Sequence, residues 1–437
     1  MIDLWDGLSP QTQDLLFLVG LLALQVVLAC IILWGLSPLP LVRALFRRFR
    51  GTAVLFVLLI AVSVGVGIGL IAQERALRHA SAQAADPFDL IVAARGSEIT
   101  ALMASVFLQP SDIPLLDGAT FGWIAGHEAV EFAAPLGFGD SIDGAPVVGT
   151  ISDLVSHLTK GAIDGRMWQT SQEALIGSAA PYAIGAELEP AHGTGPEVDH
   201  DAHEGSHFTV VGRLPHTGTP WDRAIVIPIE GLWEMHGLAN GHSLDHGGQL
   251  GAPFELALFP GTPAIVVRPK SLAGSYGLRS AFNQGEGTMA FFPGTVLARL
   301  YGLMGDVRQA MSLLALVSQG LLAISVLISL FILTRLFQRH LAVLRALGAP
   351  GRFVFGVIWS FATLLLGFGA ALGLGVGLCA ASVLSHIVTA QTDMTVSASL
   401  GWSELHLVAG FMTLASLAAL VPAISVLQQS VEKALRG

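Results

Sequence analysis

Charged side chains are scarce in this chain. Of its 437 residues, 12% are Asp, Glu, Lys or Arg and 53% are hydrophobic, whereas about a quarter of the residues in a soluble globular protein are charged. The composition therefore excludes an ordinary soluble protein and predicts an integral membrane protein.

Cysteine is nearly absent, since the chain contains 2 cysteines. Cys30 and Cys379 both fall within stretches that we expect to cross the membrane. The exported part then has no thiol with which to form a disulfide, so we expect no cysteine chemistry there.

Several functional motifs are missing as well. A Walker A loop requires G-x-x-x-x-G-K-[ST], because its backbone amides and its lysine hold the phosphates, and the sequence has no Gly-Lys pair. The G-x-S-x-G turn of the α/β-hydrolases does not occur either. We expect a chain that is not itself an enzyme and that binds no cofactor. The net charge of -10 also excludes a typical nucleic-acid-binding protein.

Long apolar runs, in contrast, are abundant. A helix needs roughly 20 apolar residues to cross a bilayer, and five stretches qualify: 15–36, 52–72, 311–334, 353–388 and 405–427. The first lacks the basic start of a secretory signal peptide and is interpreted as a retained anchor. The fourth is longer than one crossing needs, so we expect it to tilt or to extend beyond the membrane.

Basic residues set the expected orientation, because short cytoplasmic loops collect Arg and Lys. They gather after the first span, between the third and fourth spans, and in the tail: Arg43, Arg47, Arg48, Arg50, Arg335, Arg339, Arg345, Arg352, Lys433 and Arg436. The acidic start of the chain and the short loop with Asp393 and Glu404 then lie outside. Five crossings satisfy these signs and place the segment 73–300 outside the cytoplasm.

The segment 73–300 is interpreted as one folded domain inserted between the second and third spans. Short apolar runs separated by Gly and Pro predict strands at 89–93, 208–212, 224–229 and 264–267. Helices are expected at 98–107 and 294–309. Trp221 and Trp233 are expected to be packing anchors of this domain. The predicted fold is a membrane protein of about five transmembrane helices with a large inserted α+β domain.

A basic segment at 335–352, RLFQRHLAVLRALGAPGR, lies between two of the predicted spans. Its leucines recur at helical spacing, and we expect the Gly-Ala-Pro-Gly that follows to end the helix. The apolar stripe would suit docking against a partner or the bilayer. The simpler alternative is a solvated basic loop that follows the positive-inside rule.

Three stretches of this chain resemble one family. Arg339 to Ile358, RHLAVLRALGAPGRFVFGVI, resembles the cytoplasmic loop of the FtsX-like domain of MacB-type ABC transporter permeases, which commonly reads R-E-I-A-V-L-R-A-L-G-A. Leu41 to Leu70 resembles the basic lead-in and first span of that family, and Phe88 to Phe107 resembles the start of its periplasmic domain. This chain departs from the family pattern where His340 replaces the acidic residue, and where the span 15–36 precedes the usual four.

The resemblance implies a domain organisation. An additional N-terminal anchor at 1–36 is followed by a basic lead-in and span at 37–72, a periplasmic α+β domain at 73–300, and an FtsX-like domain of three spans at 301–437. It also implies a bacterial inner-membrane location, with lipid around the spans and the large domain in the periplasm.

The resemblance further implies partners. A separate ABC ATPase, which carries the ATP and Mg²⁺, would be coupled to the helix 335–352 through Arg339, His340, Leu344, Arg345 and Gly348. The permease would act as a homodimer or with a related permease, and a periplasmic or outer-membrane protein is a further expected partner.

Glycines recur every four residues in the fourth predicted span, at Gly369, Gly373 and Gly377. This spacing puts them on one helix face, where another backbone can approach closely, either within the chain or across a dimer. The alternative is that they make no special contact. The spans hold almost no titratable residue besides His386, which argues against a channel or a proton-coupled carrier.

Histidines cluster in the inserted domain, since eight of the 14 lie within 192–246. Four of them occur near Asp and Glu residues: His192, His200, His203 and His207. Imidazoles and carboxylates are ligands for zinc. Two interpretations stay open, a solvated polar loop and a zinc-binding loop.

Part of this loop, HEGSH at 203–207, matches the H-E-x-x-H pattern of metalloproteases. That pattern works on a helix, where both histidines share one face and the glutamate activates a metal-bound water. Gly205 within the motif and Pro196 before it predict a loop instead.

The function that the resemblance implies is transmission of ATP-driven motion from a separate ATPase to a periplasmic domain. This domain would act on an exported peptide, drug, lipoprotein or metal-linked substrate. The alternatives are an FtsX-like signalling or scaffold protein that controls an envelope enzyme, a zinc-linked transport component, and a membrane-anchored metallohydrolase.

Overall fold

The computed structural model describes residues 7–192, 207–303, 342–392 and 394–427, apart from 247 and 286, and the single positions 317, 320, 324, 328 and 331. The chain forms two compact units. The first, called the helical unit, comprises Met1–Ala76, Val307–Ile387 and Ser397–Gly437. The second, called the sheet unit, comprises Leu77–Asp306 and Val388–Val396.

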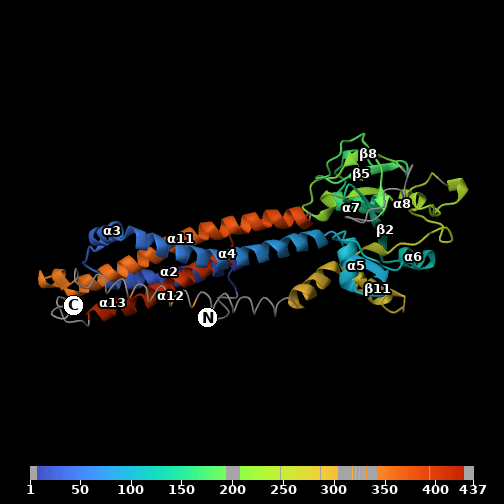
Figure 1. Cartoon of the computed structure of the whole chain (residues 1–437). Coiled ribbons are helices and arrows are strands. Elements are labelled where there is room, and N and C mark those ends of the chain that lie inside the picture. Colours follow the sequence, from blue (N-terminus) through green and yellow to red (C-terminus); the bar gives the residue numbers. More distant parts are fainter. Residues whose placement is uncertain are drawn as a thin grey trace. The chain divides into compact units, whose positions relative to one another are not determined.

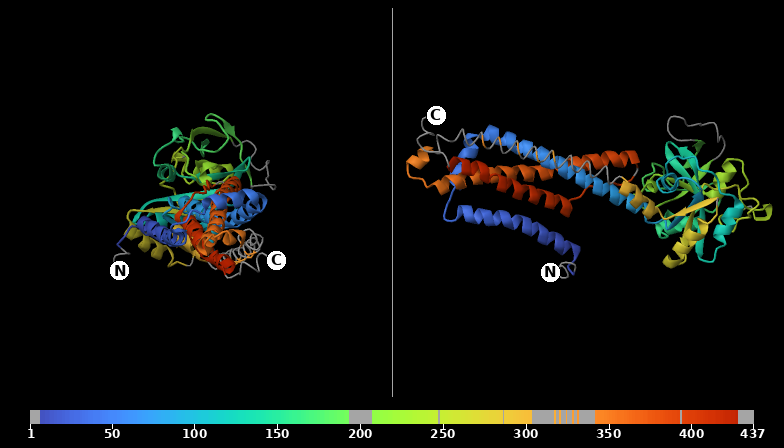
Figure 2. Two further views of the ribbon diagram at one scale, coloured as in Figure 1. Left: turned by 90° about the vertical axis from the view of Figure 1, so that its left-hand side faces the viewer. Right: turned by 90° about the horizontal axis from the view of Figure 1, so that it is seen from below.

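Four helices of the described residues are long and apolar enough to cross a membrane, one of them made of two consecutive helices. The helices are α2 (Pro10–Leu33), α3 (Leu39–Arg48), α4 (Arg50–Ala85), α11 (Gly351–Thr392), α12 (Trp402–Ala418) and α13 (Leu420–Leu427). Within the helical unit, α2, α4, α11 and α12 run side by side (Figures 1 and 2). Four of the five predicted spans correspond to these helices. The fifth, 311–334, lies outside the described residues except for five single positions.

Two helices are much longer than a bilayer requires. With a rise of 1.5 Å per residue, the 36 residues of α4 and the 42 residues of α11 give lengths of about 54 Å and 63 Å, against a hydrocarbon core of about 30 Å. The last residues of each helix, from Leu77 in α4 and from Val388 in α11, belong to the sheet unit.

The first helix, α2, is joined to the rest of the helical unit by side-chain hydrogen bonds. Ser9 caps its start by accepting a bond from the amide of Thr12. Thr413 of α12 donates to the carbonyl of Leu21 at 2.9 Å, and Arg352 donates to the carbonyl of Ile31 at 2.9 Å. Side-chain hydrogen bonds to backbone carbonyls help to hold this helix, which has little buried apolar surface.

The sheet unit contains a mixed sheet and short helices. Its strands are β1 (Leu90–Ala94), β2 (Val130–Ile142), β3 (Ala145–Thr150), β4 (Asp164–Gly165), β5 (Glu173–Ile176), β6 (Glu187–Leu188), β7 (Ala191–His192), β8 (Phe208–Arg213), β9 (Ile225–Pro228), β10 (Ala264–Pro269) and β11 (Thr288–Phe291). Its helices are α5 (Glu98–Ser105), α6 (Gly118–Ala125), α7 (Ser152–Thr159), α8 (Ile229–Met235) and α9 (Leu272–Phe282). A further helical stretch covers 293–303.

The strand order is β11-β1-β10-β2-β3-β9-β5-β8-β4, with β7 on β2 and β6 on β8. The pairs β3–β9 and β5–β8 are parallel and the others antiparallel. The central strands are buried along their whole length, as in β9, because helices such as α8 pack on them. The sheet unit thus has the mixed α and β content that was predicted.

Long strands β2 and β3 are joined by the tight turn Asp143–Gly144. Both residues have positive φ, at 49° and 80°, as a type I′ hairpin turn requires. The predicted strands correspond to β1, β8, β9 and β10, but no prediction covered β2 or β3. Trp221 and Trp233 are both 4% exposed and act as packing anchors.

Candidate functional site

The three glycines singled out in the sequence lie against α4 in the helical unit. A Cβ atom at Gly369 would come within 2.6 Å of the Ile60 Cβ, and one at Gly373 within 2.8 Å of the Val64 Cβ. A Cβ at Gly377 would lie 2.7 Å from the carbonyl oxygen of Gly65. Any larger residue at these three positions would push α4 and α11 apart, and the close approach is made within the chain.

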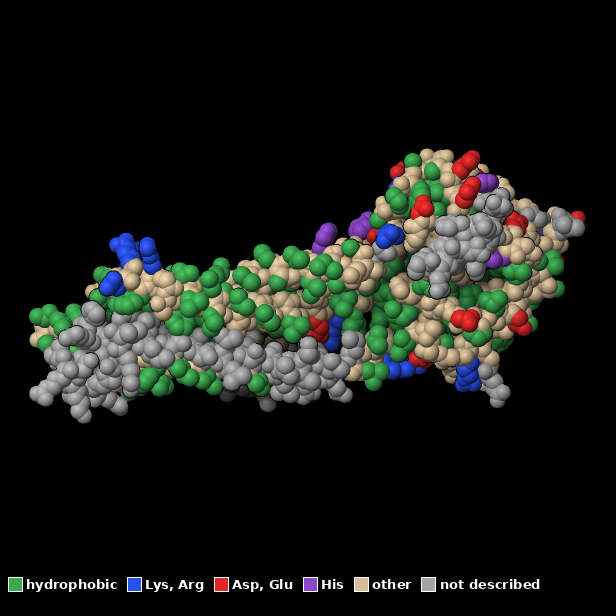
Figure 3. Space-filling model, in the orientation of Figure 1, with side chains coloured by type: hydrophobic (Ala, Val, Ile, Leu, Met, Phe, Trp, Pro, Cys, Tyr) green, Lys and Arg blue, Asp and Glu red, His purple; other side chains and the backbone are tan. Residues whose placement is uncertain are grey.

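Basic residues border the start of α4. Arg43, Arg47 and Arg48 of α3 are exposed, and Lys and Arg side chains gather over α3 on the face seen in Figure 3. The opposite face of α3 packs into the apolar core through Val42, which is 1% exposed. The helix is therefore amphipathic, with a free basic face.

The start of α11 also follows a basic segment, the one at 335–352. Arg339 and His340 lie outside the described residues. Residues 342–346 are helical, and Gly348, with φ of 99°, ends this helix. The amides of Gly348 and Ala349 donate to the carbonyls of Arg345 and Leu344, which is the Schellman pattern.

Two expectations for this segment need correction. Gly351 does not help to end the helix; it opens α11, because the carbonyl of Pro350 accepts from the amide of Phe353. The expected apolar stripe is also divided: Leu344 packs against the core of the helical unit, while Leu347 is 80% exposed. The leucine face is therefore only partly available to a partner, and Arg345 is half-buried.

An ion pair joins α4 to the start of α12, between Arg75 and Glu404. Glu404 was predicted to lie in a short acidic loop outside the cytoplasm; it lies instead in the first turn of α12, with a side chain that is 0% exposed. His406, two residues further along α12, was not among the predicted site residues; its ring contacts the carbonyl of Asp14 at 2.9 Å. His386 of α11 is exposed. No basic residue lies close enough to Glu404 in the sequence to have predicted this ion pair.

In the sheet unit, the turn at 217–222 contacts the C-terminal end of α4 and the segment that follows α11. Gln83 of α4 donates to the carbonyl of Thr217 at 2.7 Å, and the amide of Thr395, which follows α11, donates to the carbonyl of Gly218 at 3.0 Å. The carboxylate of Asp222 holds the turn by accepting from the amides of Thr217 and Gly218 at 2.8 and 2.7 Å.

The predicted histidine ligands do not assemble in the described residues. His200 and His203 lie outside them, as does most of the HEGSH motif. His207 is exposed, immediately precedes β8, and has its Nδ1 atom 3.2 Å from Glu189. The backbone of His192 lies in β7. Among the described residues, no three His, Cys, Asp or Glu side chains form a group able to hold a metal ion.

One buried pair in the sheet unit is unusual. The side chains of Glu230 and His242 are both 2% exposed, and their closest nitrogen and oxygen atoms are 3.3 Å apart. Burial raises the pKa of Glu230, although the Gly251 amide donates to its carboxylate at 2.6 Å. This pair joins α8 to the loop before β10 and is closed to solvent, so it fits a structural role.

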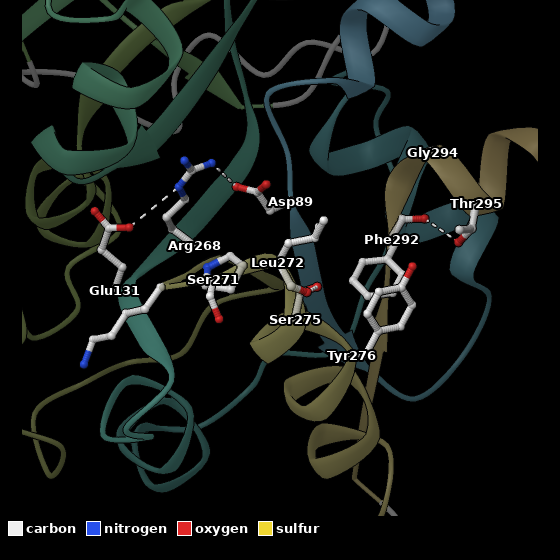
Figure 4. Close-up of a pocket in the computed structure, with 12 residues that line it drawn as sticks. Asp89, Glu131, Arg268, Ser271, Leu272, Ser275, Tyr276, Phe292, Gly294 and Thr295 are labelled. Atoms are coloured by element: carbon white, nitrogen blue, oxygen red, sulfur yellow. Dashed lines mark hydrogen bonds and ion pairs between the residues drawn. The ribbon is translucent and has the colours of Figure 1, made fainter.

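A cavity of about 550 Å³ opens beside β10 and α9 (Figure 4). Arg268 lies between Asp89 and Glu131 on one side of it, and Tyr276 and Phe292 pack edge to face on the other. Lys270 is the second cation among its lining residues. Two carboxylates and two cations balance, so the cavity has no net charge that would select an ionic ligand.

Comparisons with known proteins add the following. No protein-family model matches the chain, and no curated protein matches it. Among solved structures, the chain is similar to the periplasmic region of MacB from Actinobacillus actinomycetemcomitans, at 8% identity and a TM-score of 0.31, over 49% of this chain and 95% of that one.

Proposed function

We propose that this chain is the membrane-spanning permease subunit of an ABC transporter of the MacB/FtsX type. It would lie in a bacterial inner membrane with the sheet unit in the periplasm, and it would transmit motion to a periplasmic substrate. The observation that carries this proposal is the path of α4 and α11. Each begins at a basic segment, and each ends in the sheet unit.

The glycine contacts between α4 and α11 support this mechanism. Because a Cβ atom at Gly373 would clash with Val64, the two helices pack backbone to backbone. Helices packed in this way move as a pair, since close-packed interfaces resist continuous deformation. A push at the start of α11 would therefore also reach α4.

The 217–222 turn supplies the last step of the proposed path. It accepts hydrogen bonds from Gln83 at the end of α4 and from Thr395 just after α11. A displacement of either helix end would move this turn and, through Trp221 in the same turn, the core of the sheet unit.

ATP hydrolysis would come from a separate ATPase with bound ATP and Mg²⁺, since the sequence has no Walker A motif. The permease would act as a homodimer or with a related permease. Substrates of this class include peptides, drugs and lipoproteins.

Charge reversal at Arg345 tests the coupling. The full chain would be co-expressed with the ABC ATPases of its own organism, purified in nanodiscs, and assayed for ATP hydrolysis and for movement of substrate. We expect the unaltered chain to form a stable complex with one of these ATPases. We expect Arg345→Glu to show a several-fold loss of permease-stimulated ATP hydrolysis. Arg48→Glu is the matched control, because it makes the same change in charge on α3.

The absence of any complex with an ATPase would contradict the proposed function. Hydrolysis without movement of any substrate would favour the signalling or scaffold alternative instead. Unchanged coupling in Arg345→Glu would move the ATPase contact away from the 335–352 segment.

A further inference from the structure

The short helix α3 lies in the sequence between two helices of membrane length. Residues 34–38 connect it to the end of α2, and Phe49 alone separates it from the start of α4. Because α2 and α4 are proposed membrane spans, these short connections hold α3 at the surface of the bilayer.

One side of α3 is fixed to the helical unit by packing. Val42 is 1% exposed, and Leu45 and Phe46 pack against the core of the unit. The ring centroid of Phe46 lies 4.5 Å from that of Phe361 in α11. The helix is therefore held in one orientation, and its outer side presents a defined set of side chains.

The outer side of α3 presents cations without counter-ions. Arg43, Arg47 and Arg48 are exposed, and they form no hydrogen bond or ion pair with any residue that the structure describes. The sequence contains no Asp or Glu between Asp14 and Glu74. Charge complementarity therefore requires that the partner of this surface bring negative charge.

Exposed apolar side chains accompany these cations. Ile31 at the end of α2 is 62% exposed, Trp34 in the turn after it is 77% exposed, and Leu39 in the first turn of α3 is 64% exposed. Leu39, Arg43 and Arg47 are spaced by four residues, so they form one stripe along α3. A small soluble anion would leave the apolar part of this surface in water, whereas the bilayer interface is where tryptophan is enriched.

A phospholipid has the two parts that this surface requires. A guanidinium group offers planar donors that can hold two phosphate oxygens at once. Arg43 and Arg47 are one helical turn apart, with Cβ atoms about 5–6 Å from each other, so both can reach one phosphate. Arg352 of α11 adds a further positive charge beside α2, because it donates to the carbonyl of Ile31 at 2.9 Å.

We propose that Leu39, Arg43 and Arg47 bind an anionic phospholipid of the leaflet that faces the cytoplasm. The arginines would hold its phosphate, and an acyl chain would cover Trp34 and Ile31. This inference rests on the membrane location in the proposed function, but it does not depend on an ATPase.

The test uses the full chain in dodecyl maltoside, titrated with dioleoyl-phosphatidylglycerol. Dioleoyl-phosphatidylcholine, which has the same chains and a phosphate but no net charge, is titrated in parallel. Native mass spectrometry resolves each bound lipid and gives its Kd. We expect one phosphatidylglycerol to bind at least about tenfold more tightly than phosphatidylcholine, a difference of about 1.4 kcal/mol.

Substitutions in α3 locate the binding site. Arg43→Gln and Arg47→Gln should each weaken the binding of phosphatidylglycerol several-fold and leave that of phosphatidylcholine unchanged. Arg48→Gln is the matched control: it removes the same charge from the same helix, but about 140° around the axis from Arg43, and it should lose much less affinity. Thermal unfolding checks that each variant is folded, which the exposure of these side chains favours.

A second probe separates the lipid from its headgroup. Glycerol 3-phosphate carries the phosphate without acyl chains, and it should not compete with phosphatidylglycerol at concentrations that saturate the lipid site. Leu39→Ser changes the apolar end of the stripe without changing its charge, and it should weaken the binding of phosphatidylglycerol.

Four results would overturn the proposal. These are equal affinity for the two lipids, unchanged lipid binding in folded Arg43→Gln and Arg47→Gln, an equal loss in Arg48→Gln, and full competition by glycerol 3-phosphate. The third would indicate diffuse attraction to positive charge, and the fourth a site for free phosphate.

The ATPase is the other candidate for this basic surface. A double variant, Arg43→Gln with Arg47→Gln, that binds lipid like the wild type but no longer joins the ATPase would assign these arginines to the ATPase. Failure to find any ATPase partner would contradict the proposed function and would leave the lipid measurement unaffected.

Discussion

Arg75 of α4 forms an ion pair with the wholly buried carboxylate of Glu404 at the start of α12. Its Nη1 atom donates to both carboxylate oxygens, at 2.7 and 2.6 Å, and its Nη2 atom donates to the carbonyl of Ser399. Glu404 also caps its own helix by accepting from the amide of Gly401 at 2.9 Å. The pair ties together two helices whose residues are 329 positions apart in the sequence.

Replacing Arg75 by Ala should destabilise the helical unit markedly. Glu404 would keep a buried negative charge without a partner, and breaking a buried ion pair costs about 3–5 kcal/mol. Because the Arg75 side chain is 37% exposed, we expect about 3 kcal/mol, at the lower end. Equilibrium unfolding in mixed micelles measures the loss.

The control for this change is Arg95→Ala, which removes an exposed arginine of the sheet unit and should change stability little. The double variant Arg75→Gln with Glu404→Gln should recover part of the loss, since no charge is then left buried alone. Equal stability of Arg75→Ala and Arg95→Ala would contradict the assignment.

A leucine at Gly373 should separate α4 from α11. Its Cβ would lie 2.8 Å from the Val64 Cβ and 2.9 Å from the Ala61 carbonyl oxygen, and such overpacking costs about 1–3 kcal/mol or more. Gly375→Leu is the matched control, because a Cβ there meets nothing within 4 Å. The measurement is the unfolding midpoint of each variant. Equal midpoints for the two variants would show that the face of α11 with Gly373 does not pack closely against α4.

Removing the carboxylate of Asp222 should open the 217–222 turn. In Asp222→Ala, the amides of Thr217 and Gly218 lose the acceptors that lie 2.8 and 2.7 Å away. Unmet buried amides cost about 1–3 kcal/mol. Hydrogen exchange at these two amides should accelerate strongly, with no such change in Asp112→Ala, which alters an exposed residue. Slow exchange in Asp222→Ala would show that the turn is held by other contacts.

The stability contributed by Glu173 should depend on pH in the acid range. Hydrogen bonds from Arg166 lower the pKa of Glu173 to about 2. A folded-state pKa below the unfolded value of about 4.3 means that this stability is full above the unfolded value and is lost as pH falls toward 2. Wild type should therefore be more stable than Glu173→Gln at pH 7.

Thermal unfolding across this range provides the measurement. The difference between wild type and Glu173→Gln should shrink below about pH 4.3 and vanish near pH 2. Asp164→Asn, at an exposed position in β4, is the control and should show no comparable convergence. A difference that stays constant from pH 7 to pH 2 would rule out the lowered pKa as its source.

Some features of the fold could be predicted because they depend on local composition. Four of the spans and the strands β1, β8, β9 and β10 are continuous apolar runs, which period and length reveal. The helix end at Gly348 was also predictable, since the left-handed conformation that it adopts favours glycine.

Other features could not be predicted, because they depend on partners far away in the sequence. The strand β2 has glycines, a proline and a bulge in its interior, and these interrupt the alternation typical of a strand. Glu404 was predicted to lie in a short acidic loop outside the cytoplasm, and only the fold brings Arg75 to it from another helix. The leucines of 335–352 likewise predict one apolar stripe. In the structure, Leu344 packs against the core of the helical unit, while Leu347 is exposed.

By itself, the sequence determined that this chain is rich in membrane-length apolar helices, that basic residues precede α4 and α11, and that a polar domain lies between them, because hydropathy and charge are local properties. Only the tertiary structure decided that the glycines of α11 face α4, that Arg75 neutralises Glu404, and that Phe46 of α3 packs against α11. These depend on which distant segments come together to bury apolar surface and to satisfy polar groups, and that choice is made by packing of the whole unit.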